Sequence, residues 1–249
     1  MVKKLLKNTL QTTLKRFGIC AVRVPKPHTP DVIFIAVPKT GSQSVRAALY
    51  RKGLVEYSEN SYGHFQGQDR GMVSFGHLHL DALREAGIVD EAFFAKAFKF
   101  AFVRNPYDRL YSAYSYLSRL GLRQNATNIQ SRIHRYKNFR DFVLNEIEGK
   151  PFTGPGLYKV RENSLLAPQV QWLDSASGAP FTDFVGRFER LEEDWEEVCS
   201  KVGLANAQLP KLNTSTKKND YRSAYTTDLV DIVSTAYRND LTRFKYFFE

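Results

Sequence analysis

A short polar segment of the chain combines residue types that bind anions. It consists of Pro38, Lys39, Thr40, Gly41, Ser42, Gln43 and Ser44. The glycine lets the backbone approach a ligand closely, the lysine supplies a positive charge, and the hydroxyl groups supply further donors. Where such a segment joins a strand to a helix, backbone N–H groups and the positive end of the helix point at the same place. The segment therefore predicts a site for a phosphate or a phosphosulfate.

A second group of residues predicts a second anion site. Arg104 follows an apolar run at 98–103, and Ser112 lies about two turns into the helix that is expected after it. A guanidinium fork and a hydroxyl together suit an oxyanion. Arg109, one turn before Ser112, is a weaker candidate and has a surface ion pair as its alternative. Two anion sites at neighbouring strand ends match a nucleotide that carries phosphates at both ends of its ribose.

The first segment differs from the Walker A loop, GxxxxGK[ST]. That motif places its lysine after two glycines, whereas Lys39 precedes the one glycine of the segment, Gly41. A metal-dependent phosphotransferase also needs a carboxylate at a strand end, and neither buried-strand run ends in Asp or Glu. Taken alone, the segment fits an ordinary strand-to-helix turn equally well.

The elements that position these residues can be predicted from the pattern of apolar side chains. Residues 31–37 form a continuous β-branched and aromatic run, which is typical of a strand buried on both faces of a parallel sheet. Residues 43–52 show helical spacing, so a helix follows the loop directly. The run at 98–103 and a helix from 107 to about 120 repeat this arrangement, with Pro106 in the first helical turn. We therefore predict an α/β fold with a central, mostly parallel sheet.

Further elements are expected along the rest of the chain. They are helices near 81–86, 139–147, 191–202 and 228–240, and a strand at 183–188. We interpret the less regular, partly basic residues 121–170 as an insertion or lid on the substrate side. A basic amphipathic helix is expected within 1–30, where seven Lys or Arg occur and no acidic residue; it packs on the domain or contacts a membrane surface or a polyanion. Residues 31–249 are predicted to form one domain.

The composition limits the class of protein. The 249 residues carry a net charge of +10, which favours anionic partners such as nucleotides, nucleic acids, acidic glycans or anionic lipids without choosing among them. Cys20 and Cys199 lie far apart and show neither metal-ligand nor redox spacing. No window approaches the roughly 20 apolar residues that span a bilayer. We expect a soluble protein that needs no metal.

The two anion-binding segments resemble the donor-binding motifs of the carbohydrate-type, Golgi-related (family-2-like) sulfotransferases. VPKTGSQS is similar to their 5′-phosphosulfate loop, whose usual form is close to PKTGGTS, and FVRNPYDRLYSAY is similar to their 3′-phosphate motif. Shorter matches occur in the same order, and the resemblance covers about residues 31–249. These matches are Gly76-His77, Pro168-Gln169 with Trp172-Leu173, Val185 to Glu189 with Asp194-Trp195, and Tyr237, Asp240, Phe244 and Tyr246.

The resemblance implies a P-loop-like three-layer fold and an O-sulfotransferase. Its donor would be 3′-phosphoadenosine 5′-phosphosulfate (PAPS), and its product would be adenosine 3′,5′-bisphosphate (PAP). Lys39 would neutralise charge on the bridging oxygen and the sulfuryl group, with Thr40 to Ser44 contacting the 5′ end. Arg104 and Ser112 would bind the 3′-phosphate. Ser and Gln replace Gly and Thr of the usual motif here, which leaves the contact of Gln43 open.

Transfer to a hydroxyl also requires a base, and histidine has an ordinary pKa near the working pH. The residues alone leave His77 and His79 as candidates, with His64 behind them. In related glycan sulfotransferases a Gly-His dipeptide carries the base, and this resemblance selects His77.

Arg187 and residues 212–218 each have two possible interpretations. Arg187 either reaches the nucleotide or pairs with Glu189 or Glu192. Residues 212–218 either close over the donor or form a solvated loop.

The acceptor is expected to be a hydroxylated molecule, with a carbohydrate as the first candidate, and no nucleic-acid partner is expected. Relatives in animal cells are Golgi membrane proteins, and because this chain shows no such anchor we expect a bacterial-type cytoplasmic enzyme. The oligomeric state stays open. Two other classes remain as alternatives: a P-loop-type nucleotide phosphotransferase, and a non-catalytic polyanion-binding protein that would use its basic N-terminal helix and residues 121–170.

Overall fold

A computed structural model of the protein describes most of the chain from residue 31 onward. The described residues are 31–52, 66–68, 71–73, 80, 84, 89, 91–121, 132–150, 159–160, 163–175, 177–204, 208–210, 212 and 220–249. Of the predicted elements, the N-terminal helix lies outside this set, and so does most of the helix near 81–86. In the part that the structure describes, no helix has the length and apolar character needed to cross a bilayer.

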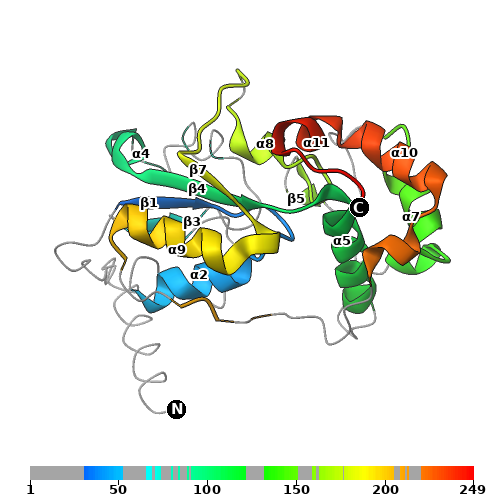
Figure 1. Cartoon of the computed structure of the whole chain (residues 1–249), viewed down its shortest axis with the longest axis horizontal. Helices are drawn as coiled ribbons and strands as arrows, with labels where there is room; N and C mark the ends of the chain where they lie inside the picture. The colour runs from blue at the N-terminus through cyan, green and yellow to red at the C-terminus, as the bar shows by residue number, and fades with distance from the viewer. Residues whose placement is uncertain are drawn as a thin grey trace, which may run out of the picture.

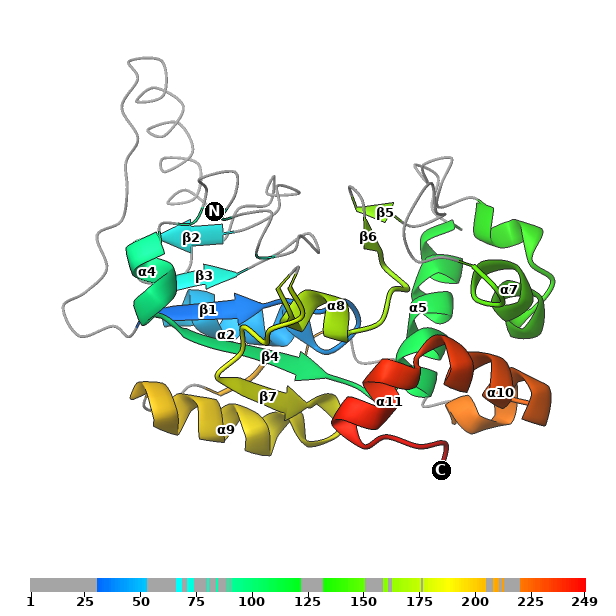
Figure 2. The same cartoon turned by 90° about the horizontal axis from the view of Figure 1, so that it is seen from above.

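The centre of the fold is a five-stranded sheet with the order β2-β3-β1-β4-β7 (Figures 1 and 2). Its strands are β1 (Val32–Ile35), β2 (Gln66–Gln68), β3 (Gly71–Val73), β4 (Phe98–Val103) and β7 (Phe184–Arg187). Strand β1 pairs in parallel with β3 and β4, and β4 pairs in parallel with β7. Only the edge strand β2 runs antiparallel to its neighbour. The predicted strands at 31–37, 98–103 and 183–188 are confirmed, whereas β2 and β3 were not predicted.

Helices cover both faces of this sheet. On one face, α2 (Ser42–Arg51) and α9 (Leu191–Val202) pack against Phe34, Phe100 and Phe102. On the other, side chains of α4 (Glu91–Lys96), α8 (Val170–Leu173) and α11 (Arg238–Phe244) pack against the opposite side chains of β1 and β4. The alternation of side chains along a strand explains how one run of apolar residues fills two cores. This confirms the predicted three-layer α/β fold.

A third core joins helices beyond the carboxyl ends of the parallel strands (Figure 2). It contains side chains of α5 (Pro106–Gly121), α7 (Phe139–Glu146) and α10 (Thr227–Ala236). The predicted helices at 43–52, 107–120, 139–147 and 191–202 are all confirmed within one or two residues at each end. The remaining short elements are a hairpin of β5 (Lys159–Val160) and β6 (Asn163–Ser164) and 3-10 turns at Arg132–Arg135, Phe188–Arg190 and Tyr221–Ala224.

The prediction of one last helix at 228–240 is wrong. Helix α10 ends at Ala236 and α11 begins at Arg238, because Tyr237 leaves the helical conformation with a ψ of 24°. Its buried hydroxyl donates to the carbonyl of Leu166 at 2.6 Å. The break allows Tyr237 and Asp240 to contact the segment at 165–170. These contacts arise from tertiary packing, so the helical periodicity of the sequence does not reveal them.

Candidate donor-binding site

The polar loop after β1 has the backbone of an anion-binding turn. Lys39 and Gly41 both adopt left-handed conformations, with φ of 69° and 82°. Gly41 is the N-cap of α2 and supplies no side-chain oxygen to the helix end. The left-handed conformation favours glycine, and a Cβ atom here would lie 2.8 Å from Cδ2 of Leu191 on α9, so that any other side chain would displace Leu191. A left-handed non-glycine residue such as Lys39 is uncommon and is concentrated at ligand sites.

The hydroxyl groups of this loop are mostly turned toward the protein. Thr40 is buried, and its Oγ1 donates to the carbonyl of Val37 at 3.0 Å. Ser44 is also buried, and its Oγ accepts from the backbone N–H of Leu212 at 3.4 Å. Ser42 is buried as well, whereas Gln43 is half-buried. Thr40 and Ser44 therefore hold the loop in shape, and Leu212 places the start of the 212–218 segment beside it.

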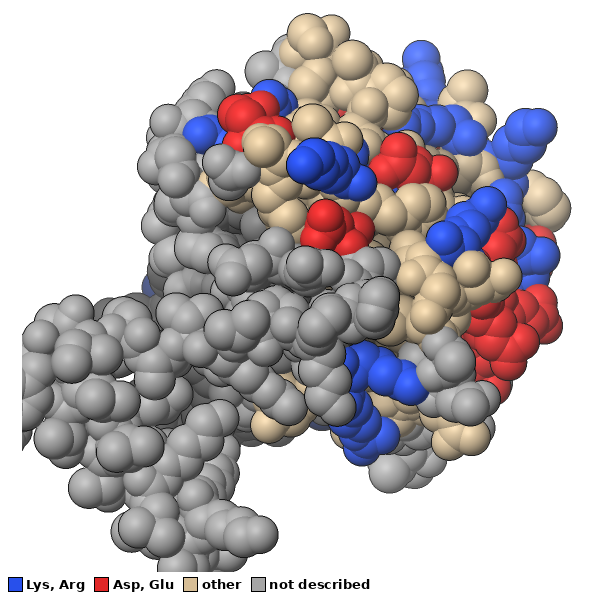
Figure 3. Space-filling view, turned by 90° about the vertical axis from the view of Figure 1, so that its left-hand side faces the viewer, with Lys and Arg blue, Asp and Glu red and all other residues tan. Residues whose placement is uncertain are grey.

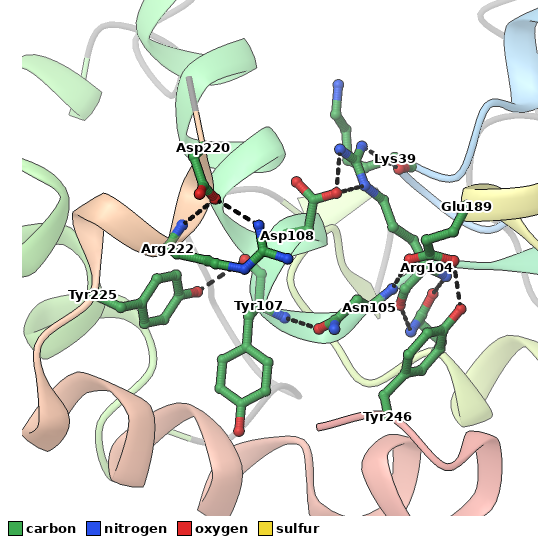
Figure 4. Close-up of polar contacts among 11 residues, drawn as sticks. Lys39, Arg104, Asn105, Tyr107, Asp108, Glu189, Asp220, Arg222, Tyr225 and Tyr246 are labelled. Atoms are coloured by element: carbon green, nitrogen blue, oxygen red, sulfur yellow. Dashed lines mark hydrogen bonds and ion pairs between the residues drawn. The ribbon is translucent and has the colours of Figure 1, made fainter. Parts of the chain in front are cut away.

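Arg104 lies against this loop. Its Nη1 donates to the carbonyl oxygen of Lys39 at 3.3 Å, while Nε and Nη2 both lie 2.8 Å from Oδ2 of Asp108 (Figure 4). Its Cζ lies over the ring of Phe188, 4.2 Å from the ring centroid. The second predicted anion-binding residue thus contacts the backbone of the first predicted segment.

Ser112 lies on the side of α5 that faces the loop. Asp108 precedes it by four residues and contacts Arg104, and Tyr116 follows it by four residues and contacts Lys39, whose Nζ lies 4.0 Å from the ring centroid. Helical residues four apart share a face, so Ser112 sits between these two contacts. The structure brings Lys39, Arg104 and Ser112 to one surface, although their individual roles as ligands stay predictions.

The amino group of Lys39 has unusual electrostatics. Burial, followed by the nearby positive charges of Arg104 and Arg119, lowers its pKa from 10.5 to about 8. Desolvation and like charges both disfavour an ammonium ion, and an incoming anion would reverse these effects. Arg104 and Arg119 thus lie close enough to act on Lys39, and the carboxylate of Asp108 pairs with Arg104, a cationic arrangement that fits a polyanionic ligand.

The β4–α5 turn that carries Arg104 is held by buried polar contacts. Oε1 of Gln169 accepts from the backbone N–H of Arg104 at 2.9 Å, and its Nε2 donates to the carbonyl of Arg104 at 2.8 Å. Asp240 in turn accepts from the backbone N–H groups of Gln169 and Val170 at 2.8 and 3.0 Å. Burial raises the pKa of this carboxyl group. Gln169 and Asp240 were noticed in the sequence only as family matches, and the structure shows what they contact.

The residue after Arg104 is held from other sides. The backbone N–H of Asn105 donates to Glu189 at 2.7 Å, and the other carboxylate oxygen of Glu189 accepts from the hydroxyl of Tyr246 (Figure 4). Asn105 also caps α5, since its Oδ1 accepts from the backbone N–H of Tyr107 at 3.1 Å. The turn therefore has little freedom to move Arg104 away from the loop.

Arg109 does not form a surface ion pair. It is buried, and its Nε donates to the carbonyl of Pro38 at 3.0 Å. Its Nη1 and Nη2 donate to the carbonyls of Ala167 and Leu165, each at 3.0 Å. Arg109 therefore braces the polar loop from inside the protein. The burial of Arg109 depends on carbonyl groups that are distant in the sequence, which the helical pattern does not indicate.

Arg187 contacts the C-terminal segment instead of pairing with Glu189 or Glu192, and its contact with the nucleotide stays a prediction. Its Nη2 donates to the carbonyl of Phe244 at 2.6 Å, and its guanidinium lies 4.7 Å from the ring of Tyr246. Gly186, just before it, is required by packing, because a Cβ atom there would lie 2.5 Å from the ring of Phe102. Arg187 connects β7 to the C-terminal segment.

Other predicted features lie outside the described residues. His77, His79 and His64 belong to this set, as do residues 213–218. The base therefore stays a prediction. Among the described residues no group of three or more His, Cys, Asp or Glu side chains could hold a metal ion. On the face shown in Figure 3, the described Lys and Arg side chains are interleaved with Asp and Glu rather than gathered in one block.

Comparison with known proteins gives matches that cover most of the chain. A model of the sulfotransferase family matches residues 26–247, a span that contains both the polar loop and the Arg104 turn. A crystal structure of a sulfotransferase from Alicyclobacillus acidocaldarius matches with 15% sequence identity and a TM-score of 0.43, covering 88% of this chain and 97% of that one. No curated protein matches the chain significantly.

Proposed function

Because the chain belongs to the sulfotransferase family (family-2-like), we propose that this enzyme takes its sulfuryl group from PAPS and transfers it to a hydroxyl group, with a carbohydrate as the first candidate acceptor. The observation that carries the proposal is the contact between the two loops. Nη1 of Arg104 reaches the carbonyl of Lys39, and the side chain of Lys39 lies along the same helix that carries Ser112. The proximity of these two cations supports a site for both ends of a bisphosphorylated nucleotide.

The proposed reaction is a direct in-line transfer. The acceptor oxygen attacks sulfur, a new O–S bond forms, and the S–O bond to the 5′-phosphate breaks, so that its electron pair leaves with PAP. The acceptor proton goes to a base, for which His77 is our candidate. Catalysis then comes mainly from positioning and from stabilisation of charge on the departing phosphate.

Each residue of the candidate site has a separate task in this proposal. The loop at 38–44 and the start of α2 bind the 5′ end of the donor through backbone N–H groups. Lys39 neutralises the charge that develops on the bridging oxygen. Arg104 and Ser112 bind the 3′-phosphate, and Phe188 keeps the guanidinium plane oriented.

The donor site can be tested by calorimetry with PAP, which needs no acceptor. We expect Lys39→Ala and Arg104→Ala to weaken PAP binding by about 10- to 100-fold, and Ser112→Ala by about fivefold, from the usual strength of hydrogen bonds to charged groups. Arg51→Ala, which removes an exposed arginine at the far end of α2, serves as the control for net charge. Unchanged PAP affinity in all three site variants would falsify the assignment.

The acceptor and the base need a turnover assay. Radiolabelled PAPS is offered with separate glycans, lipids, small alcohols and phenols, and the labelled product identifies the acceptor class. With that acceptor, His77→Ala is expected to lower kcat while PAP affinity changes less than twofold. ATP with magnesium and heparin are included as ligands, since turnover of ATP would favour a phosphotransferase. Heparin binding that survives both Lys39→Ala and His77→Ala would favour a polyanion-binding protein.

A further inference from the structure

Tyr116 is an exposed aromatic residue in contact with the lysine of the candidate site. It lies on α5, one turn beyond Ser112, and 39% of its surface is accessible to solvent. The Nζ atom of Lys39 lies 4.0 Å from the centroid of its ring. An exposed tyrosine adds little to a hydrophobic core, so its contact with the cation is the more informative feature.

The charges around Lys39 make this contact important. Arg104 and Arg119 both act on its amino group and both disfavour the protonated form. The carboxylate on the same face, Asp108, accepts from Nε and Nη2 of Arg104. The electron-rich face of the Tyr116 ring is therefore a favourable neighbour for a cation in a repulsive field.

A free lysine side chain also has many rotamers, and ordering it can cost up to about 2 kcal/mol. Contact with the Tyr116 ring restricts the position of the amino group before any ligand arrives. An anion that then binds between the loop and α5 contacts an amino group that is already in place. Binding therefore no longer includes the entropy cost of ordering the lysine side chain.

We propose that Tyr116 is a positioning residue for Lys39, whose aromatic face holds the amino group along α5 so that it can bind the 5′ end of the donor. The inference rests on the proposed function. It adds a residue that neither the polar loop nor the Arg104 motif contains.

A double-mutant cycle with PAP as the ligand tests the inference. Tyr116→Leu is expected to weaken PAP binding by about 3- to 30-fold, the range that corresponds to a partly desolvated cation–π contact, and to lower kcat to a similar extent. In the Lys39→Ala background the same substitution should change PAP affinity by less than twofold. Tyr116→Phe keeps the ring and should remain within twofold of the natural protein in both measurements.

Tyr50→Leu is the matched control, because Tyr50 is 43% exposed and lies at the far end of α2. Its PAP affinity should equal that of the natural protein, and thermal melting of all variants verifies their folding. Three results would overturn the inference: an equal loss from Tyr116→Leu in both backgrounds, no loss in either, or tighter binding. If Lys39→Ala alone leaves PAP affinity unchanged, the proposed function fails instead.

Discussion

Lys39 holds its proton less firmly than an ordinary lysine. Burial is the main reason that its pKa falls to about 8, and the charges of Arg104 and Arg119 act in the same direction. A bound anion favours the charged form, so the donor complex should bind a proton that the free protein loses above pH 8. At the scale of single residues, ligand binding and protonation are therefore linked.

The linkage predicts a fall in PAP affinity as the pH rises. The affinity for PAP is highest below the pKa of Lys39 in the free protein and falls above it, because above this pKa only the complex retains the proton on Lys39. We expect affinity to fall by about five- to tenfold between pH 7.5 and 9, a window in which the phosphates of PAP are fully ionised. Calorimetry at several pH values measures this change. In Lys39→Met the same window should be flat, and an unchanged slope there would assign the titration to another group.

The β4–α5 turn shows how one element depends on another. Gln169 precedes α8 and bonds both backbone groups of Arg104, and Asp240 on α11 bonds the backbone of Gln169 and Val170. Residues far apart in the sequence therefore set the position of the guanidinium that is proposed to bind the 3′-phosphate.

Replacement of Gln169 by leucine should damage both stability and binding. Gln169→Leu leaves two backbone groups of Arg104 without their partner, which we expect to cost about 2–4 kcal/mol of unfolding free energy. PAP binding by the folded fraction should weaken about 3- to 10-fold, because the turn is released. Urea unfolding and calorimetry measure the two effects. Gln171→Leu, two residues away and half-buried, is the control and should change stability by less than about 0.5 kcal/mol.

The result separates two roles for Gln169. A loss of stability with unchanged PAP affinity would mean that the residue supports the fold but does not position Arg104.

At the scale of the whole molecule, the C-terminal segment packs beside the turn that carries Arg104. The ring of Phe248 packs edge-on against Tyr107 with centroids 5.1 Å apart, and it also contacts Tyr225. The carbonyl of Phe247 accepts from Nδ2 of Asn105 at 3.0 Å. The last residues thus join the helical core around α5 to the turn that carries Arg104.

Deletion of residues 247–249 tests this connection. We expect the unfolding free energy to fall by about 2–3 kcal/mol, since a half-buried aromatic residue and a partly buried hydrogen bond are lost together. Urea unfolding measures the change. Phe247→Ala retains the backbone carbonyl and removes a ring that is 63% exposed, so it should be nearly neutral. Equal stability of the deleted and the full-length protein would show that the segment is dispensable.

The sequence by itself determined the local features of this protein. The strands at 31–37 and 98–103 follow from continuous apolar runs, and the helices after them follow from helical spacing and from the positions of Gly41 and Pro106. The same local order also carried the resemblance to sulfotransferases, because both donor motifs are short and contiguous.

Only the tertiary structure decided which distant residues meet. Three contacts join residues that lie about 65 to 77 positions apart: Arg109 with Pro38, Gln169 with Arg104, and Tyr116 with Lys39. No periodic pattern in the sequence indicates such contacts. The break at Tyr237 has the same origin, since the tyrosine and Asp240 satisfy polar groups of the 165–170 segment. Local propensity specifies an element, whereas buried polar groups find their partners only after the elements have packed.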